Sequence, residues 1–325
     1  MNAQRRKFLK AAAAGGALYA FGRTPDTVYA QAVGIGGMGD YKALVCLFMF
    51  GGNDCWNMVV PTSTAEYNAY SLSRGGEAGV GSGLAVPRAS LLPITALNTN
   101  LNGVTFGLHP SMSGMQSLFA AQRAAIVANV GPLLRPTTKA QYQSPGWELP
   151  PQLFSHNDQQ DQWHSLRGTS LLKSGWGGRV ADVLAAQTGS QQLPLNVSLA
   201  GQTYFQAGVS ARPYVMGSTG ASTFAGFGNT GVNFARRQAF EAVVNASLTS
   251  TSNTVYERSF ATVQQRAVQY ADLVNGALAQ SRSFTALPDS GVTLSPLATQ
   301  LRTVAKMISA RSALSMSRQI FFVST

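Results

Sequence analysis

The chain has 325 residues, of which 45 % are hydrophobic and 11 % are charged, and it carries a formal net charge of +11 at pH 7. This length and apolar content allow a sizeable core and argue against a chain that is disordered throughout. The basic residues form no run interleaved with aromatic residues, so we expect no nucleic acid partner. A mildly basic surface still favours anionic ligands.

The N-terminal segment predicts export from the cytoplasm. Arg5 and Arg6 precede a short, weakly apolar run rich in Ala and Gly, which is typical of a twin-arginine signal peptide. The run is too short and too weakly apolar for a membrane span, so we expect no stable span after cleavage. An amphipathic N-terminal helix is the alternative. We predict a signal peptide over residues 1–32 and a periplasmic or extracellular location.

Strand-like and helix-like patterns alternate along the rest of the chain. Apolar runs predict buried strands at 42–50, 124–130, 193–201 and 320–323. Helical patterns follow Ser111 and Ser155 and cover 175–187, 233–247, 253–280 and 295–315. A helix that leads into a buried strand is typical of a parallel sheet. We predict a single domain over 41–325, an α/β fold in which a largely parallel sheet forms the middle of a three-layer α/β/α sandwich.

Polar residues follow the first predicted strand directly. Gly51 and Gly52 allow unusual backbone dihedral angles, and Asn53 and Asp54 come next with hard oxygen atoms that suit a divalent cation. Ligand sites in parallel α/β sheets lie beyond the carboxyl ends of the strands. The same four residues are also ordinary turn chemistry, in which Asp54 hydrogen-bonds its own turn. Both interpretations stay open at this point.

A second group of candidate residues lies at Ser155 and His156. Ser155 stands where a helix is predicted to begin, and a helix N-terminus favours anions such as phosphate or sulfate. The same field favours a serine alkoxide, so Ser155 is a candidate nucleophile with His156 beside it. The alternative is structural, because Ser155 followed three residues later by Asp158 is a variant of the helix capping box.

Seven stretches together resemble one protein family. They are RRKFLK, LVCLFMFGGNDCWNMVVP, FGLHPSM, AAIVANVG, FSHNDQQDQW, GWGGRVAD and SRQIFFVST, in that order. This order resembles the bacterial domain-of-unknown-function 1501 family, which is exported by the twin-arginine route and related to the alkaline phosphatase and sulfatase superfamily. The resemblance implies an alkaline phosphatase-like sandwich with a divalent metal ion at the strand ends. It also implies that Asp54, with Asn53 beside it, binds the metal and that Ser155, with His156, is catalytic.

The chain departs from this family after its last predicted strand. In the family, a Gly-Gly-Phe-Asp-Thr-His-like segment and a further segment with Asp and His are expected to supply the remaining metal ligands, and this sequence has neither. The sequence is then either truncated at its C-terminal side or a naturally shortened member of the family, and in both cases we expect the 325-residue form to be inactive as a hydrolase. Residues 320–323 would then form an edge or unsupported strand that is prone to aggregation.

The predicted function is therefore that of a periplasmic, metal-dependent phosphatase- or sulfatase-like hydrolase, inactive in this form. A non-catalytic periplasmic binding or assembly protein that retains the fold is the alternative. The expected cofactor is a divalent metal ion. The expected partners are a small anionic ester or an envelope polymer, and a protein partner fits the alternative function.

Overall fold

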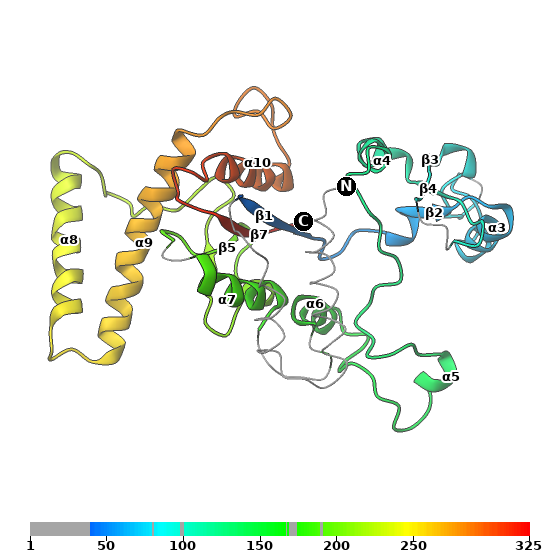
Figure 1. The fold of residues 1–325 in the computed structure, drawn as a ribbon, viewed down its shortest axis with the longest axis horizontal. Helices are drawn as coiled ribbons and strands as arrows, with labels where there is room; N and C mark the ends of the chain where they lie inside the picture. Colours follow the sequence, from blue (N-terminus) through cyan, green and yellow to red (C-terminus); the bar gives the residue numbers. More distant parts are fainter. Residues whose placement is uncertain (1–39, 80, 98–100, 167, 169–173, 189–190) are drawn as a thin grey trace. The chain divides into compact units, whose positions relative to one another are not determined.

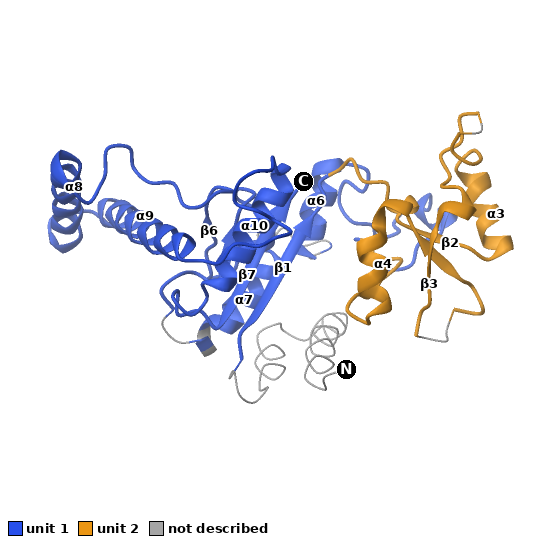
Figure 2. Cartoon of the chain, turned by 90° about the horizontal axis from the view of Figure 1, so that it is seen from above, with its two compact units in different colours: residues 1–50, 132–325 blue, residues 51–131 orange. Residues whose placement is uncertain are grey.

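The computed structural model describes residues 40–79, 81–97, 101–166, 168, 174–188 and 191–325. The predicted signal peptide lies outside these residues. Contacts divide the chain into two compact units, unit 1 with residues 1–50 and 132–325 and unit 2 with residues 51–131 (Figure 2). The single domain expected over 41–325 stays a prediction.

Unit 1 is built on a parallel four-stranded sheet, which confirms the predicted α/β class. The strand order is β1-β7-β5-β6, and the bounds are β1 Lys42–Phe48, β5 Asn196–Ser198, β6 Tyr214–Val215 and β7 Arg318–Ser324. β7 pairs in parallel with β1 on one side and with β5 on the other. In this register Phe321 lies between Val45 of β1 and Val197 of β5.

Helices cover both faces of this sheet. The helices of unit 1 are α5 Lys139–Tyr142, α6 His156–Ser165, α7 Trp176–Thr188, α8 Gly231–Thr249, α9 Val255–Ala279 and α10 Pro296–Ser309. Figure 1 shows α10 on one face and α6 and α7 on the other, a layout compatible with an α/β/α sandwich. Thr254 and Glu257 form a capping box that begins α9, and Ser295 caps α10 ahead of Pro296.

The core of unit 1 is centred on β7. Residues 319–323 are all buried, and the apolar ones pack against Val304 and Met307 of α10 and against Phe205. The expectation that 320–323 forms an edge or unsupported strand is therefore wrong. Its apolar run has a strand on each side and a helix layer on each face, which is the environment in which continuous apolar strands occur.

The first strand, in contrast, lies at the edge of the sheet. In the described part of the chain β1 pairs with β7 alone, and its residues alternate between half-buried and exposed. Leu44, Cys46 and Phe48 pack against the core, whereas Val45 and Leu47 are exposed. The prediction of a strand here is confirmed, but its expected full burial is wrong, because an edge strand buries one face only.

Unit 2 contains a small antiparallel sheet. Its order is β2-β4-β3, from β2 Val59–Pro61, β3 Leu92–Ile94 and β4 Phe106–Leu108, and its helices are α3 Thr64–Ser73 and α4 Ser113–Ala120. Short 3-10 turns lie at η1 Cys55–Asn57, η2 Arg88–Ser90 and η3 Pro110–Met112. The core consists of Val60, Tyr67, Val86 and Leu91.

The strand predicted at 124–130 is absent from the described structure. These residues form no regular element, and Val127 is 78 % exposed. β-propensity describes how well side chains fit a half-buried surface, and a strand needs a neighbour to form. The preceding helix, α4, also begins later than expected. His109 caps the 3-10 turn η3 over Pro110–Met112, and the α-helix starts only after this turn, at Ser113.

The central position of β7 predicts unequal costs for two matched substitutions. Val323→Ala removes two buried carbon atoms beside α10 and should lower the free energy of unfolding by about 2 kcal/mol. Val45→Ala makes the same chemical change on the exposed face of β1 and should cost less than about 0.5 kcal/mol. Urea denaturation followed by circular dichroism measures both. Equal costs would contradict the assignment of β7 as the central strand.

Candidate functional site

A groove opens at the carboxyl end of β1, where the fold class predicts a ligand site. Its volume is about 380 Å³. The side chains around it come from the end of β1 and from the start of α6 with the loop before it: Phe48, Met49, Phe50, Leu153, Phe154, Ser155, His156, Gln159, Gln160 and Trp163. We call it the β1–α6 groove. Most of its wall is apolar and aromatic, and the polar groups gather at the helix N-terminus.

α6 is held against the end of β1 by two kinds of contact. Gln160 Nε2 donates a hydrogen bond to the carbonyl oxygen of Phe50 at 3.1 Å. One turn later, the His164 ring packs against the ring of Phe48, and the two ring centroids are 4.3 Å apart. These contacts place the first turn of α6 beside the strand end, so Ser155 lies near the carboxyl end of β1.

Ser155 is the N-cap of α6. Its Oγ accepts a hydrogen bond from the Asp158 N–H at 3.3 Å, and its hydroxyl donates to the Asp158 carboxylate. The first intrahelical bond runs from Gln159 N–H to the Ser155 carbonyl at 3.0 Å. The capping interpretation of Ser155 is thereby confirmed, and the proposed role of Ser155 as a nucleophile stays a prediction.

His156 is the first residue of α6 and is exposed to solvent. It lines the groove together with Ser155, so the structure brings the two predicted catalytic residues together. The N–H groups of His156 and Asn157 precede the first intrahelical hydrogen bond, and helix geometry leaves such groups available to a ligand. Burial and the charge of Asp158 raise the pKa of Asp161 on the next turn.

His164 lies behind the groove and was not predicted as part of it. It is buried, its ring contacts Phe48, Phe50 and Phe322, and its Nε2 has no hydrogen-bond partner among the described residues. Burial lowers the pKa of its imidazole from 6.5 to about 4, because the protonated ring would lose its hydration. No signal in the sequence separates it from His156, since its burial arises from β1 and β7.

Asp54 and Asn53 belong to unit 2, whereas Ser155 and His156 belong to unit 1. The Asp54 carboxylate accepts a hydrogen bond from the Trp56 N–H at 3.2 Å and forms an ion pair with Arg74. The Asn53 side-chain amide donates to the Met58 sulfur at 3.3 Å. The turn interpretation is confirmed, because Asp54 caps the 3-10 turn η1.

The residues around Asp54 do not fit a divalent metal site. A guanidinium already neutralises the one carboxylate, and a hard cation needs several oxygen ligands. Among the described residues, no three His, Cys, Asp or Glu side chains gather as a metal-binding group. The assignment of Asp54 and Asn53 as metal ligands stays a prediction.

Comparisons with known proteins add no identification. No family model matches the chain, and no match was found among curated proteins or among solved structures. Over the described ranges, no helix is both long enough and apolar enough to cross a membrane.

His164 predicts a specific loss of stability in acid. Its pKa is lowered in the folded state, so its contribution is complete above about pH 6.5 and is lost as the pH falls toward 4, up to about 3 kcal/mol. His164→Phe should flatten this part of the profile, because no proton can then favour the unfolded chain. The measurement is the free energy of unfolding between pH 4 and pH 7. His156→Phe, which removes an exposed histidine instead of a buried one, is the matched control.

Proposed function

We propose that this chain is an exported protein with a phosphatase- or sulfatase-like framework that binds an organic phosphate or sulfate ester in the β1–α6 groove. The observation that supports the proposal most directly is the composition of the groove. An aromatic wall formed by Phe48, Phe50 and Trp163 stands beside the N-terminus of a ten-residue helix. This arrangement suits a ligand with an apolar group at one end and an anionic group at the other.

The anionic group of such a ligand would lie at the first turn of α6. The N–H groups of His156 and Asn157 and the positive end of the helix dipole favour it there. The His156 imidazole is exposed at the same place and adds a positive charge when it is protonated. The apolar group would cover the aromatic wall, where roughly 25 cal/mol is gained for each Å² removed from water.

Asp158 opposes the binding of an anion. Its carboxylate lies one turn into the helix and already interacts with the positive end of the helix dipole through Ser155. A bound phosphate or sulfate would therefore meet a like charge nearby. This repulsion predicts a weak site, and it gives the proposal a sharp test, because neutralising Asp158 should strengthen binding.

The test measures binding of phenyl phosphate by calorimetry. Asp158→Asn should tighten binding about fivefold, which corresponds to the roughly 1 kcal/mol of repulsion between unit charges a few ångströms apart in water. The variant keeps a side-chain oxygen that can accept the hydrogen bond from the Ser155 hydroxyl, so the helix cap is retained. Asp289→Asn, at a distant exposed ion pair with Lys306, is the matched control.

Two results would count against a binding function. Phenyl phosphate that binds no better to Asp158→Asn than to the unaltered chain would contradict the placement of the anion. Phenol that binds as well as phenyl phosphate would show that the groove recognises the apolar group alone. Phenyl sulfate, compared in the same titration, separates the two ester classes.

Hydrolysis by the same site is the second candidate function, and the contact between Ser155 and Asp158 favours it. Asp158 would take the hydroxyl proton while Ser155 Oγ forms a bond to phosphorus or sulfur. The bond to the ester oxygen breaks, and the leaving oxygen takes a proton from water or from His156. Water then hydrolyses the seryl ester and releases the inorganic anion.

The two functions are distinguished by Asp158→Asn, which should tighten binding in a binding protein and reduce turnover in a hydrolase. If the chain hydrolyses p-nitrophenyl phosphate, Asp158→Asn should reduce turnover by at least about 100-fold, because the base that accepts the proton is lost. Ser155→Ala should abolish turnover but change phenyl phosphate binding little. Release of p-nitrophenol is the measurement. Tighter binding by Asp158→Asn, with no turnover by either protein, would leave binding as the function.

A further inference from the structure

The helical hairpin of α8 and α9 carries an apolar surface that the groove function does not use. The two helices are joined by residues 250–254, and α8 lies on the side of α9 that faces away from the sheet in both views (Figures 1 and 2). The C-terminal half of α9 packs into the core through residues such as Val274. Its N-terminal half contacts α8 and is otherwise open to solvent.

One stripe of residues runs along α9 through both halves. It repeats at alternating spacings of four and three residues: Tyr256, Phe260, Val263, Ala267, Tyr270, Val274 and Ala277. This spacing is typical of helices that pack along a seam. Val274 and Ala277 are buried in the core, whereas Tyr256, Phe260 and Val263 are 87 %, 67 % and 62 % exposed. The stripe therefore has a packing partner at one end and a solvent-exposed surface at the other.

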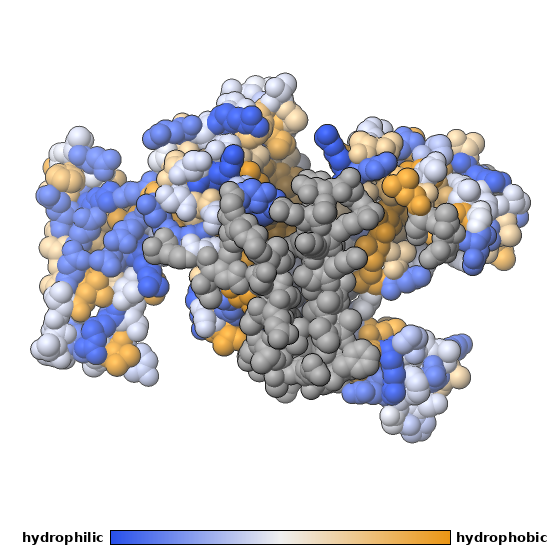
Figure 3. Space-filling view, viewed as in Figure 1, coloured by the Kyte–Doolittle hydropathy of each residue, from blue (hydrophilic) through white to orange (hydrophobic). Residues whose placement is uncertain are grey.

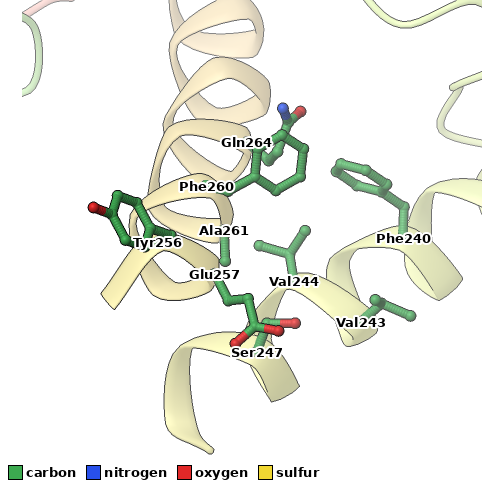
Figure 4. Close-up of a pocket in the computed structure, with 9 residues that line it drawn as sticks. All are labelled: Phe240, Val243, Val244, Ser247, Tyr256, Glu257, Phe260, Ala261 and Gln264. Carbon is green, nitrogen blue, oxygen red and sulfur yellow. The ribbon is translucent and has the colours of Figure 1, made fainter. Parts of the chain in front are cut away.

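A groove of about 420 Å³ lies beside the exposed part of the stripe. Figure 4 shows Phe240 of α8 opposite Phe260 of α9, with Glu257 and Ser247 at one end. Val243 on its rim is also exposed. Figure 3 shows apolar residues at the surface of this hairpin among polar ones. The two helices thus present half of the apolar interior that a four-helix bundle would enclose.

The charges of the hairpin argue against a polyanion or a membrane surface as the partner. Its four arginines stand against two glutamates and one aspartate, a net charge of +1. One of the four, Arg237, is already in ion pairs with Glu241 and Asp272. A hairpin with so little net charge does not strongly repel an identical hairpin.

We propose that the α8–α9 hairpin binds the same hairpin of a second copy of this chain, with the two α9 helices antiparallel. A two-fold axis between Phe260 and Val263 places Phe260 against Val263 of the second copy. The next layer places Tyr256 against Ala267. Each layer thus pairs a large side chain with a smaller one, which is the arrangement that fills an interface without voids.

The residues that flank the stripe are compatible with this arrangement. The antiparallel alignment brings Glu257 near Gln264 of the second copy and Arg266 near Ser259, so no like charges meet across the seam. The exposed stripe and Val243 of two copies offer roughly 800–1,000 Å² of apolar area, since an aromatic side chain carries about 150–250 Å². That area lies at the lower end of specific interfaces and predicts a weak dimer.

Sedimentation velocity of the whole chain tests the proposal. At about 100 µM, where a weak interface of this size is populated, the unaltered chain should sediment as a dimer. Phe260→Glu and Val263→Lys should each weaken association at least tenfold, because each places a charge at an apolar layer. Val255→Glu adds a carboxylate, as Phe260→Glu does, but at an exposed position one residue before the stripe. It should leave the association constant unchanged. Circular dichroism of each variant checks that the fold is retained.

Mixing the two charged variants gives the decisive result. One layer of the mixed dimer would hold the introduced carboxylate against the introduced ammonium, and the other would keep the natural Phe260 and Val263 contact. Association should therefore return on mixing. A monomer at every concentration would overturn the proposal, and so would a dimer that both variants leave intact. Failure of the mixture to associate would overturn the antiparallel alignment.

Discussion

The insertion of β7 between β1 and β5 is the contact on which the rest of unit 1 depends. β1 and β5 are not neighbours in the sheet, and β7 supplies a parallel partner to each. The four buried apolar residues of this strand, 320–323, also belong to the core that the helix layers cover, so the packing of α7 and α10 is organised around them. Continuous apolar sequence is what a strand in this position requires.

The β1–α6 groove depends on β7 indirectly, through aromatic contacts. Phe322 of β7 packs against Phe48 and His164, and His164 in turn holds α6 against the end of β1. Ser155 and His156 are therefore positioned by a chain of aromatic contacts that begins in the middle of the sheet. The polar part of the groove lies on a helix N-terminus, and its apolar part belongs to the core. A disturbance of the core would consequently reach the first turn of α6.

The sequence predicts local features well, but it predicts poorly which segments of the chain lie side by side. The cap at Ser155 and the parallel sheet follow from short patterns, and both are present. The strand expected at 124–130 is absent and 320–323 is central rather than peripheral, because an apolar run does not specify which segments lie beside it. His164 was missed for the same reason, since its burial depends on β1 and β7. The turn at Asp54 was one of two open interpretations, and the choice needed the structure, in which Asp54 caps η1 and forms an ion pair with Arg74.

The parallel pairing of β1 with β7 also sets an order of events during synthesis. Lys42 and Arg318 are opposite each other in the register, although 276 positions separate them in the sequence. At about 5–20 residues per second, translation takes roughly 15–55 s to cover that distance. Throughout this interval β1 lacks the strand with which it pairs and the core that forms around that strand, so a newly made chain exposes Leu44, Cys46 and Phe48. A chaperone that binds short apolar segments would find its target there until β7 has been made.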